Sequence, residues 1–282
     1  MEILKIIKQT TTEVTADDIL YVIGVAFLGI WLLKTAFGTK ALVYSPVRRN
    51  KMPFYLPLVP FLIWFIFAPA AMAVKERLFP NLLDWQQVLA DNAIISASAI
   101  AAMTITLFLV RKYFVRGLKG FGLNHRSIPA DFFAAIVNLI SIYPLVLLAI
   151  VMTLYIGQII WGPEFELAQH EELKSLIQYS QPYTRAMIII TAVAIAPVFE
   201  EFLFRGLFQT LIRSYLNRPW PGIFISAILF ASAHANSSHW PALFFLGICL
   251  GYSYEKSGSL YRPIFIHALF NSASIISVLH ST

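Results

Sequence analysis

The sequence predicts an all-α, polytopic membrane protein with about eight transmembrane helices. Its 282 residues are 58% hydrophobic and only 13% charged, and the mean hydropathy is +0.70. Soluble domains are roughly 45–50% apolar and about 25% charged, so this composition indicates a chain that lies in lipid. Apolar runs recur along the chain at lengths close to the roughly 20 residues that cross a bilayer as a helix.

Eight apolar runs are candidate transmembrane helices by length and hydropathy. The fourth run is longer than one crossing needs, and the seventh is short. In chain order the runs are 19–37, 54–74, 93–110, 133–161, 187–204, 221–235, 240–254 and 260–279.

Charge sorts the connecting segments onto two sides of the membrane. The loops after the first, third, fifth and seventh runs hold lysines and arginines, whereas the alternate segments hold most of the acidic residues. By the positive-inside rule the basic loops are cytoplasmic, so both termini are expected on the other side. Topology and contact with anionic lipid head groups explain the net charge of +6. We therefore expect the lipid bilayer as a partner and no nucleic acid.

The chain is expected to form one membrane domain in two parts, residues 1–185 and residues 186–279. The polar tail before the first run holds Glu13 and Asp17, the wrong flank for a signal peptide, so we expect no cleavage. In 162–185, apolar and polar residues recur at helical spacing, which predicts a short interfacial helix, either a connector or a lid. The lone Cys249 cannot form an intramolecular disulfide.

Two adjacent carboxylates, Glu200 and Glu201, lie inside an apolar run, with Arg205 one helical turn further on. A charge in hydrocarbon costs roughly 2.5–3.5 kcal/mol on insertion scales, so intramembrane carboxylates are usually functional. Glu201 and Arg205 are four positions apart and can form an ion pair, which leaves Glu200 without that partner. This pattern predicts a structural role for Glu201 and proton chemistry for Glu200. The alternative is that both carboxylates only bond to neighbouring helices.

Further polar residues lie in the next apolar runs. His234 follows Phe230 by four positions, and His267 precedes Asn271 by four, so each pair shares one face of a helix. A lone histidine on an apolar helix is more often a packing residue, but the His267 pair makes a functional site the better interpretation. If the fifth helix extends past its apolar run, Glu200 and His234 lie at heights that differ by about 6 Å. Antiparallel packing would then bring them together.

A glutamate, two histidines and an asparagine inside a membrane suit hydrolysis by water. The carboxylate can take a proton from water, an imidazole can hold that water, and His and Asn donors can stabilise an oxyanion. No Ser, Thr or Cys stands out beside a base in these runs, so direct attack by water is favoured over an acyl-enzyme. We expect no cofactor. The alternative is that Glu200, His234 and His267 bind zinc or another divalent metal, although their spacing is not HExxH.

These residues resemble three motifs of the CPBP (CAAX protease and bacteriocin-processing, Abi-type) intramembrane endopeptidases, relatives of the type II CAAX prenyl endopeptidase. EEFLFR at 200–205 is similar to EExxxR, FASAH at 230–234 to FxxxH, and HALFN at 267–271 to HxxxN. The resemblance covers about residues 186–277.

The resemblance implies an intramembrane protease, of glutamic type or alternatively metal-dependent, with its active site inside the C-terminal helix bundle. It implies that Glu200 activates water with His234 as its partner, and that His267 with Asn271 forms the oxyanion side. The implied substrate is a membrane protein or lipidated peptide, and the expected location is a bacterial cell membrane.

Two other classes of function stay open. One is a proton-coupled transporter, which would favour inverted internal repeats, and no repeat is visible by eye. The other is a non-proteolytic immunity or scaffold protein that binds a partner. The first four apolar runs contain none of the three motifs.

Overall fold

The computed structural model describes residues 16–45, 47–168, 171–234 and 237–281. Its regular secondary structure within these ranges is helical, with one isolated β-bridge between two loops, which confirms the predicted all-α fold class.

Two predictions concern residues outside the described ranges. The first is that the N-terminal tail, which holds Glu2 and Glu13, is not cleaved, and it stays a prediction. The other is Ala235, the last residue of the predicted sixth run.

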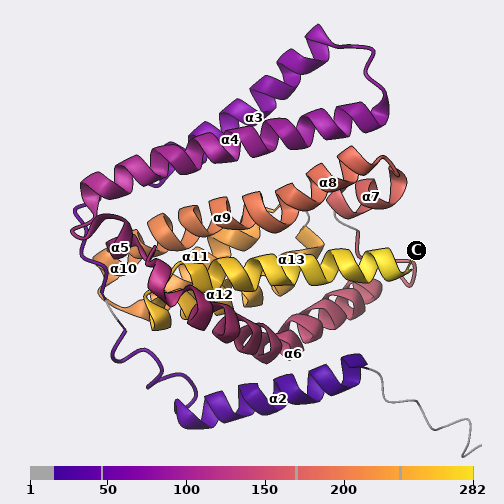
Figure 1. The fold of residues 1–282 in the computed structure, drawn as a ribbon. Coiled ribbons are helices and arrows are strands. Elements are labelled where there is room, and N and C mark those ends of the chain that lie inside the picture. The colour runs from indigo at the N-terminus through magenta and orange to yellow at the C-terminus, as the bar shows by residue number, and fades with distance from the viewer. Residues whose placement is uncertain (1–15, 46, 169–170, 235–236, 282) are drawn as a thin grey trace, which may run out of the picture.

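The N-terminal part of the chain forms a helical hairpin, a single outer helix and one very long helix (Figure 1). These elements are α2 (Ala16–Lys34), α3 (Leu58–Leu78), α4 (Asp84–Tyr113), α5 (Gly117–Phe121), the 3-10 turn η1 (His125–Ser127) and α6 (Ile128–Trp161).

The C-terminal part begins with a short helix that matches the one expected within 162–185. A continuous helical run then follows, and three further helices complete the bundle. These elements are α7 (Glu171–Gln178), α8 (Pro182–Ile190), η2 (Thr191–Ile195), α9 (Ala196–Glu201), η3 (Phe202–Gln209), α10 (Thr210–Leu216), α11 (Pro219–Ser232), the 3-10 turn η4 (Ser237–His239), α12 (Trp240–Ser257) and α13 (Tyr261–Ser281).

Five helices in the described part of the chain are long and apolar enough to cross a membrane, so the predicted number of eight is not confirmed. They are Leu58–Leu78, Asp84–Tyr113, His125–Trp161, Pro182–Leu216 and Tyr261–His280.

The differences from the predicted runs have physical reasons. The sixth run yields only α11, whose 14 residues are too few for one crossing. Helix α12 is buried by neighbouring helices along much of its length, including Leu246, Leu250 and Tyr254, each 0% exposed. A helix covered by protein does not need a lipid-facing apolar surface, which explains the polar second half of α12.

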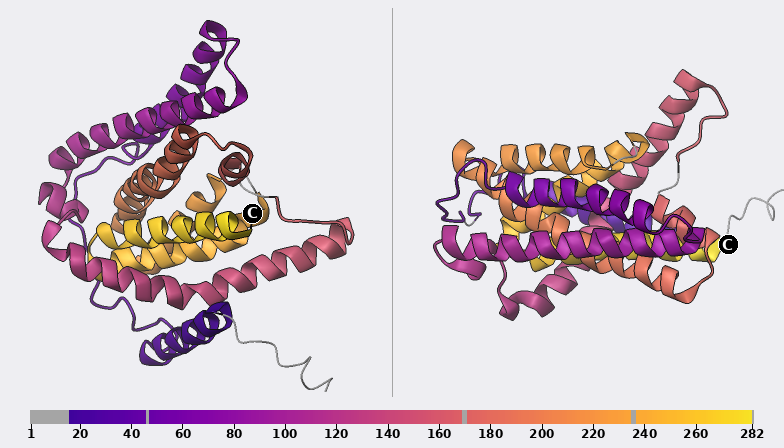
Figure 2. Two further views of the ribbon diagram at one scale, coloured as in Figure 1. Left: turned by 45° about the vertical axis from the view of Figure 1, so that its right-hand side comes forward. Right: turned by 90° about the horizontal axis from the view of Figure 1, so that it is seen from above.

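The helices form a bundle in which α12 packs against α6, α11 and α13. The α3–α4 hairpin lies on one side of the α8–α10 run, and α2 lies on the opposite side of the bundle, against α6 (Figures 1 and 2). The α2–α6 approach depends on Gly24, because a Cβ there would lie 2.4 Å from the Ile140 carbonyl oxygen. Pro144, which has no N–H, leaves that carbonyl without its i+4 donor.

The basic loops gather at one end of the bundle, where α5 and α10 lie in Figure 1, and α7 and the C-terminus lie at the other. Several bonds tie these loops together. The Leu260 amide donates to the Gly122 carbonyl at 2.9 Å, and Lys256 Nζ donates to the Ala41 carbonyl at 2.9 Å. The loops therefore share one side, as the charge pattern predicts, and their cytoplasmic orientation stays a prediction.

Candidate active site

The helix that carries Glu200 is interrupted by two π-helical segments, η2 and η3, on either side of the six-residue α9. Such segments, in which backbone bonds run from i to i+5, are often found at functional sites. The Ala196 amide follows this register and donates to the Thr191 carbonyl. Pro197 has no N–H to donate to the next carbonyl, Ala192, and Asn271 Nδ2 donates to that oxygen at 2.8 Å instead. The break in the helix thus fixes Asn271.

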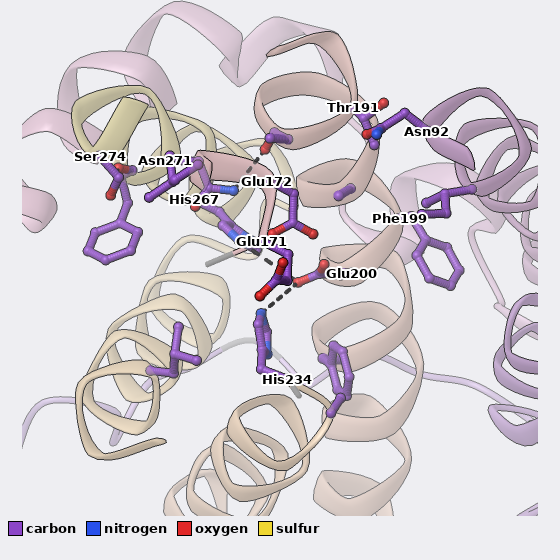
Figure 3. Close-up of a pocket in the computed structure, with 18 of the residues that line it drawn as sticks. Asn92, Glu171, Glu172, Thr191, Phe199, Glu200, His234, His267, Asn271 and Ser274 are labelled. Carbon is purple, nitrogen blue, oxygen red and sulfur yellow. Dashed lines mark hydrogen bonds and ion pairs between the residues drawn. The ribbon is translucent and has the colours of Figure 1, made fainter. Parts of the chain in front are cut away.

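Three predicted site residues converge on one point (Figure 3). Nε2 of His234 lies 3.9 Å from Glu200 Oε2, and Nε2 of His267 lies 3.8 Å from the same oxygen. That oxygen is buried and has no hydrogen-bond partner. The three groups come from α9, from the residues just after α11, and from α13. Segments 67 residues apart along the chain therefore meet around one carboxylate oxygen.

The second nitrogen of each imidazole already has an acceptor. His234 Nδ1 lies 2.8 Å from the Phe230 carbonyl oxygen, and His267 Nδ1 lies 3.0 Å from Glu201 Oε1. Since both partners accept, we assign the proton of each neutral ring to Nδ1. Both Nε2 atoms then present a lone pair towards Glu200.

Glu201 does more than the sequence suggested. The expected ion pair is present, with Arg205 Nη1 3.0 Å from Glu201 Oε1 and both side chains fully buried. The same oxygen also accepts from His267 Nδ1. Arg205 is held in turn by the Gly247 carbonyl at 3.2 Å and stacks over the Phe230 ring at 4.4 Å. Glu201 and Arg205 thus form a buried support that orients one imidazole.

The position of His234 corrects one expectation. The sequence placed it far along an apolar helix, whereas α11 ends at Ser232 and His234 lies just beyond that end. Carbonyls in the last turn of a helix lack helical donors. The ring of His234 can therefore fold back, bond to the Phe230 carbonyl and pack against the Phe230 ring, with centroids 4.8 Å apart.

A cavity of about 630 Å³ opens in front of Glu200, and the predicted residues His234, His267 and Asn271 also line it. Much of its remaining wall comes from residues that the sequence did not single out. These residues are mainly apolar on α3, α9 and α13 and polar on α4 and α7, and they include Phe61, Trp64, Asn92, Glu171, Glu172, Phe199, Phe270 and Ser274. They lie on five separate elements, and no motif links them, so only the tertiary structure identifies them as one wall.

The charge of the cavity is one-sided. Its lining residues include Glu171, Glu172 and Glu200 but no lysine or arginine. Glu171 accepts from Lys174 at 2.8 Å at the exposed surface of α7. Helix α7 is anchored by Leu176, which is fully buried against α8 and α13. The short helix expected from the sequence therefore borders the cavity rather than lying apart from it.

The spacing of Glu200, His234 and His267 differs from that of a metal site. Among the described residues no group of three His, Cys, Asp or Glu side chains is arranged to hold an ion. Glu200 Oε2 lies 3.9 Å from His234 Nε2 and 3.8 Å from His267 Nε2. A zinc ion with bonds of about 2.1 Å to the oxygen and to either nitrogen would need an O–Zn–N angle of about 130°, whereas a tetrahedral site has about 109°. For a water molecule about 2.8 Å from the same atoms, the angle at its oxygen between Glu200 Oε2 and either Nε2 is about 90°. Water fits the present spacing better.

Comparison with known proteins agrees with the motifs. Residues 182–273 match the family model of the type II CAAX prenyl endopeptidase Rce1-like proteins, which confirms the resemblance inferred from the sequence. The chain is 28% identical over 117 residues to an uncharacterized 24.3 kDa protein of Escherichia coli, covering 40% of this chain and 54% of that protein. It is 27% identical over 93 residues to the "Putative membrane peptidase YdiL" of Bacillus subtilis (strain 168), covering 33% of this chain and 37% of that protein.

The matched part thus spans about half the length of the first relative and about a third of the second. No solved structure matches the chain significantly. Together with the five apolar helices, the family match identifies an integral membrane protein that carries an Rce1-like segment.

Proposed function

Starting from the Rce1-like segment at residues 182–273, we propose that this protein is an intramembrane endopeptidase. In this proposal Glu200 activates a water molecule that hydrolyses a peptide bond of a membrane-associated substrate. The substrate segment occupies the cavity in front of Glu200, whose volume of about 630 Å³ lies in the range of roughly 300–1,000 Å³ typical of ligand pockets.

The observation that carries the proposal is the convergence of three lone pairs. Glu200 Oε2 is buried without a hydrogen-bond partner, and the two nearest imidazole nitrogens cannot donate to it while the rings are neutral. A water molecule is the smallest group that fits between them, since it can donate to Glu200 and to one ring at once. A water held in this way is aligned for proton transfer to the carboxylate.

The reaction then follows from these positions. Glu200 removes a proton from the water as its oxygen attacks the carbonyl carbon of the substrate, which forms a tetrahedral intermediate. As the C–N bond breaks, the protonated Glu200 returns that proton to the leaving nitrogen. Arg205 and Glu201 keep His267 in place during both steps.

Asn271 can assist at the intermediate. One of its two amide N–H groups is committed to the Ala192 carbonyl, and the other is available at the cavity wall. We assign this second N–H to the oxyanion, because a fixed donor in a site shielded from water stabilises developing charge strongly. His267 contributes to the oxyanion only when its Nε2 carries a proton.

The test uses purified protein in liposomes with a library of lipid-anchored, internally quenched peptides. We expect the wild type to release fragments that mass spectrometry identifies, and Glu200→Gln to release none. If neither protein cleaves any peptide but both retain one from the library, the chain is a binding protein and the enzymatic proposal is wrong.

A metal-dependent protease is the second candidate, and one observation favours it. Both imidazoles donate Nδ1–H to oxygen acceptors, the arrangement that usually orients histidine ligands of a metal. Glu200, His234 and His267 would hold the ion, which would supply Lewis-acid activation of water. Exhaustive chelation separates the candidates. Activity that survives it, with less than one zinc or iron per chain, supports glutamate catalysis, whereas loss and recovery with added metal supports the ion.

A further inference from the structure

A second hollow of about 520 Å³ lies on the other side of the helix that carries Glu200. Its walls are mainly leucine, isoleucine, valine and phenylalanine side chains from α4, α5, α6, α9, η3 and α13, with two polar residues. The lining residues are Leu107, Leu118, Leu123, His125, Ile128, Val198, Phe202, Tyr261, Ile264 and Phe265. None of them lines the cavity in front of Glu200.

This hollow lies at the basic end of the molecule. His125 and Tyr261 belong to the turns that begin α6 and α13 at that end, whereas Val198 lies deeper in the bundle on α9. Lys119 and Arg126 are exposed and directly follow the lining residues Leu118 and His125 in the chain. The hollow is therefore apolar inside and flanked by cations where the helices end.

The charge around it is one-sided. In the segments that form this end, 35–57, 111–131, 210–220 and 255–262, the acidic residues are Asp131 and Glu255. Both are buried, at 1% and 0% exposure, against Arg262 and Arg48. The exposed cations among the described residues of these segments include Lys40, Arg49, Lys51, Arg111, Lys112, Arg116, Lys119, Arg126, Arg218 and Lys256.

From this combination we propose that the hollow binds one anionic phospholipid, with an acyl chain between Leu118 and Phe202 and the phosphate near Lys119 and Arg126. Apolar walls at the end of membrane helices meet lipid chains first, and surface cations attract anionic head groups. A volume of about 520 Å³ lies within the roughly 300–1,000 Å³ of ligand pockets.

The site touches the helix of the candidate active site. Val198 and Phe202 are four positions apart and share one face, and they flank Glu200 in the chain. A chain that packs against them supports the short α9 segment between its two π-helical neighbours. Bound lipid therefore stabilises the fold, whether or not the protein is a protease.

The experiment measures lipid retention and thermal stability, neither of which depends on cleavage. Purified protein is exchanged into neutral detergent, supplied with phosphatidylglycerol or phosphatidylcholine, and examined by native mass spectrometry and thermal melting. We expect one phosphatidylglycerol to be retained per chain, with a Tm increase that saturates at one equivalent, and no such retention of phosphatidylcholine. Equal retention of both lipids overturns the proposal.

Two matched pairs of variants locate the site. Leu118→Trp fills the hollow and should abolish retention, whereas Leu216→Trp, at a position 47% exposed at the same end, should not. Lys119→Gln with Arg126→Gln should weaken retention about thirtyfold, as expected from the loss of two cations beside an anionic head group. Lys40→Gln with Arg218→Gln removes the same charge outside the hollow and should have a much smaller effect.

Three outcomes contradict the assignment. Equal weakening by both charge pairs would mean that only the overall field of the basic end attracts the lipid. Unchanged retention in a folded Leu118→Trp variant would mean that no acyl chain enters the hollow. A co-purified acidic peptide or a second copy of this chain on the same surface, displaced by Leu118→Trp, would give the hollow a different occupant.

Discussion

Two buried polar clusters lie along the helical run from α8 to α10. They differ in whether their atoms without hydrogen-bond partners border a cavity. The first joins Glu201, Arg205 and His267 and ends at Glu200 Oε2, which faces a cavity. In the second, at the basic end, Gln209 Nε2 donates to Glu255 Oε1 at 3.3 Å and to the Gly251 carbonyl at 3.0 Å.

The second cluster is closed by an arginine. The Arg48 guanidinium lies 3.4 Å above the Tyr254 ring centroid, donates to the Tyr254 carbonyl and lies 3.8 Å from Glu255 Oε2. Neither of the two cavities described above is lined by Arg48, Gln209, Tyr254 or Glu255. A buried carboxylate therefore does not by itself indicate catalysis in this protein. The distinguishing feature is a set of unpartnered acceptors that face open space.

The largest expected effect separates Glu200 from Glu255. Glu200→Gln should lower the cleavage rate by about 10²–10⁴-fold, the usual contribution of a general base, with little change in Tm. Glu255→Gln should lower Tm and leave the rate of the remaining folded protein near that of the wild type. Rates from the liposome assay and melting curves of both variants check this comparison, and a similar loss of rate in both would remove the distinction.

The next effect concerns the two arginines. Arg205→Ala leaves Glu201 buried without its cation and should lower the free energy of unfolding by about 3–5 kcal/mol. Arg48→Ala should cost less, about 1–3 kcal/mol, because Arg48 lies 3.8 Å from Glu255, whereas Arg205 lies 3.0 Å from Glu201. Denaturant titration in mixed micelles measures both. A larger loss of unfolding free energy for Arg48→Ala would contradict this order, because it would show that the cluster around Glu255 contributes more to stability than the one around Glu201.

A smaller effect tests the link between Glu201 and His267. Glu201→Gln keeps an acceptor for His267 Nδ1 but removes the charge, so we expect a roughly 10–100-fold loss of rate, as for supporting partners of site histidines. Gln209→Glu places a carboxylate in the other cluster and is the matched control, since it should change stability without a specific loss of rate. An unchanged rate in folded Glu201→Gln would reduce Glu201 to a partner of Arg205 alone.

The last effect concerns Asn271. Asn271→Ala removes the bond to the Ala192 carbonyl, worth about 1 kcal/mol of stability, and the N–H that we assign to the oxyanion. We expect a lower kcat with little change in KM. Ser274→Ala is the control, because Ser274 lines the same cavity and its hydroxyl bonds only within its own helix, to the Phe270 carbonyl. Equal kinetics for both variants would contradict the oxyanion role.

Much of this site follows from local sequence features. The spacing of Glu201 and Arg205 indicates an ion pair because residues four apart on a helix are neighbours, and the structure contains that pair. The apolar environment of Glu200, His234 and His267 singles these residues out, because polar groups in membrane runs are costly. Their catalytic roles stay predictions.

Other features depend on structure that no spacing reveals. Helical periodicity assumes 3.6 residues per turn, so it did not reveal the π-helical segments around α9 or the Ala192 carbonyl that Asn271 reaches. Hydropathy also predicted eight spans, a number that is not confirmed, and it does not distinguish a helix buried by protein, such as α12, from one buried by lipid.

The amino-acid sequence alone predicts the all-α membrane character, the grouping of the basic loops and the resemblance of the C-terminal segment to a known family. All three follow from composition and short-range spacing, which do not depend on how the helices pack. The packing of the helices brought particular atoms of Glu200, His234 and His267 together and set Glu201 against His267. It also placed the α3–α4 hairpin at the cavity wall. These features are contacts between segments distant in the chain, and their geometry is set by packing of the whole bundle.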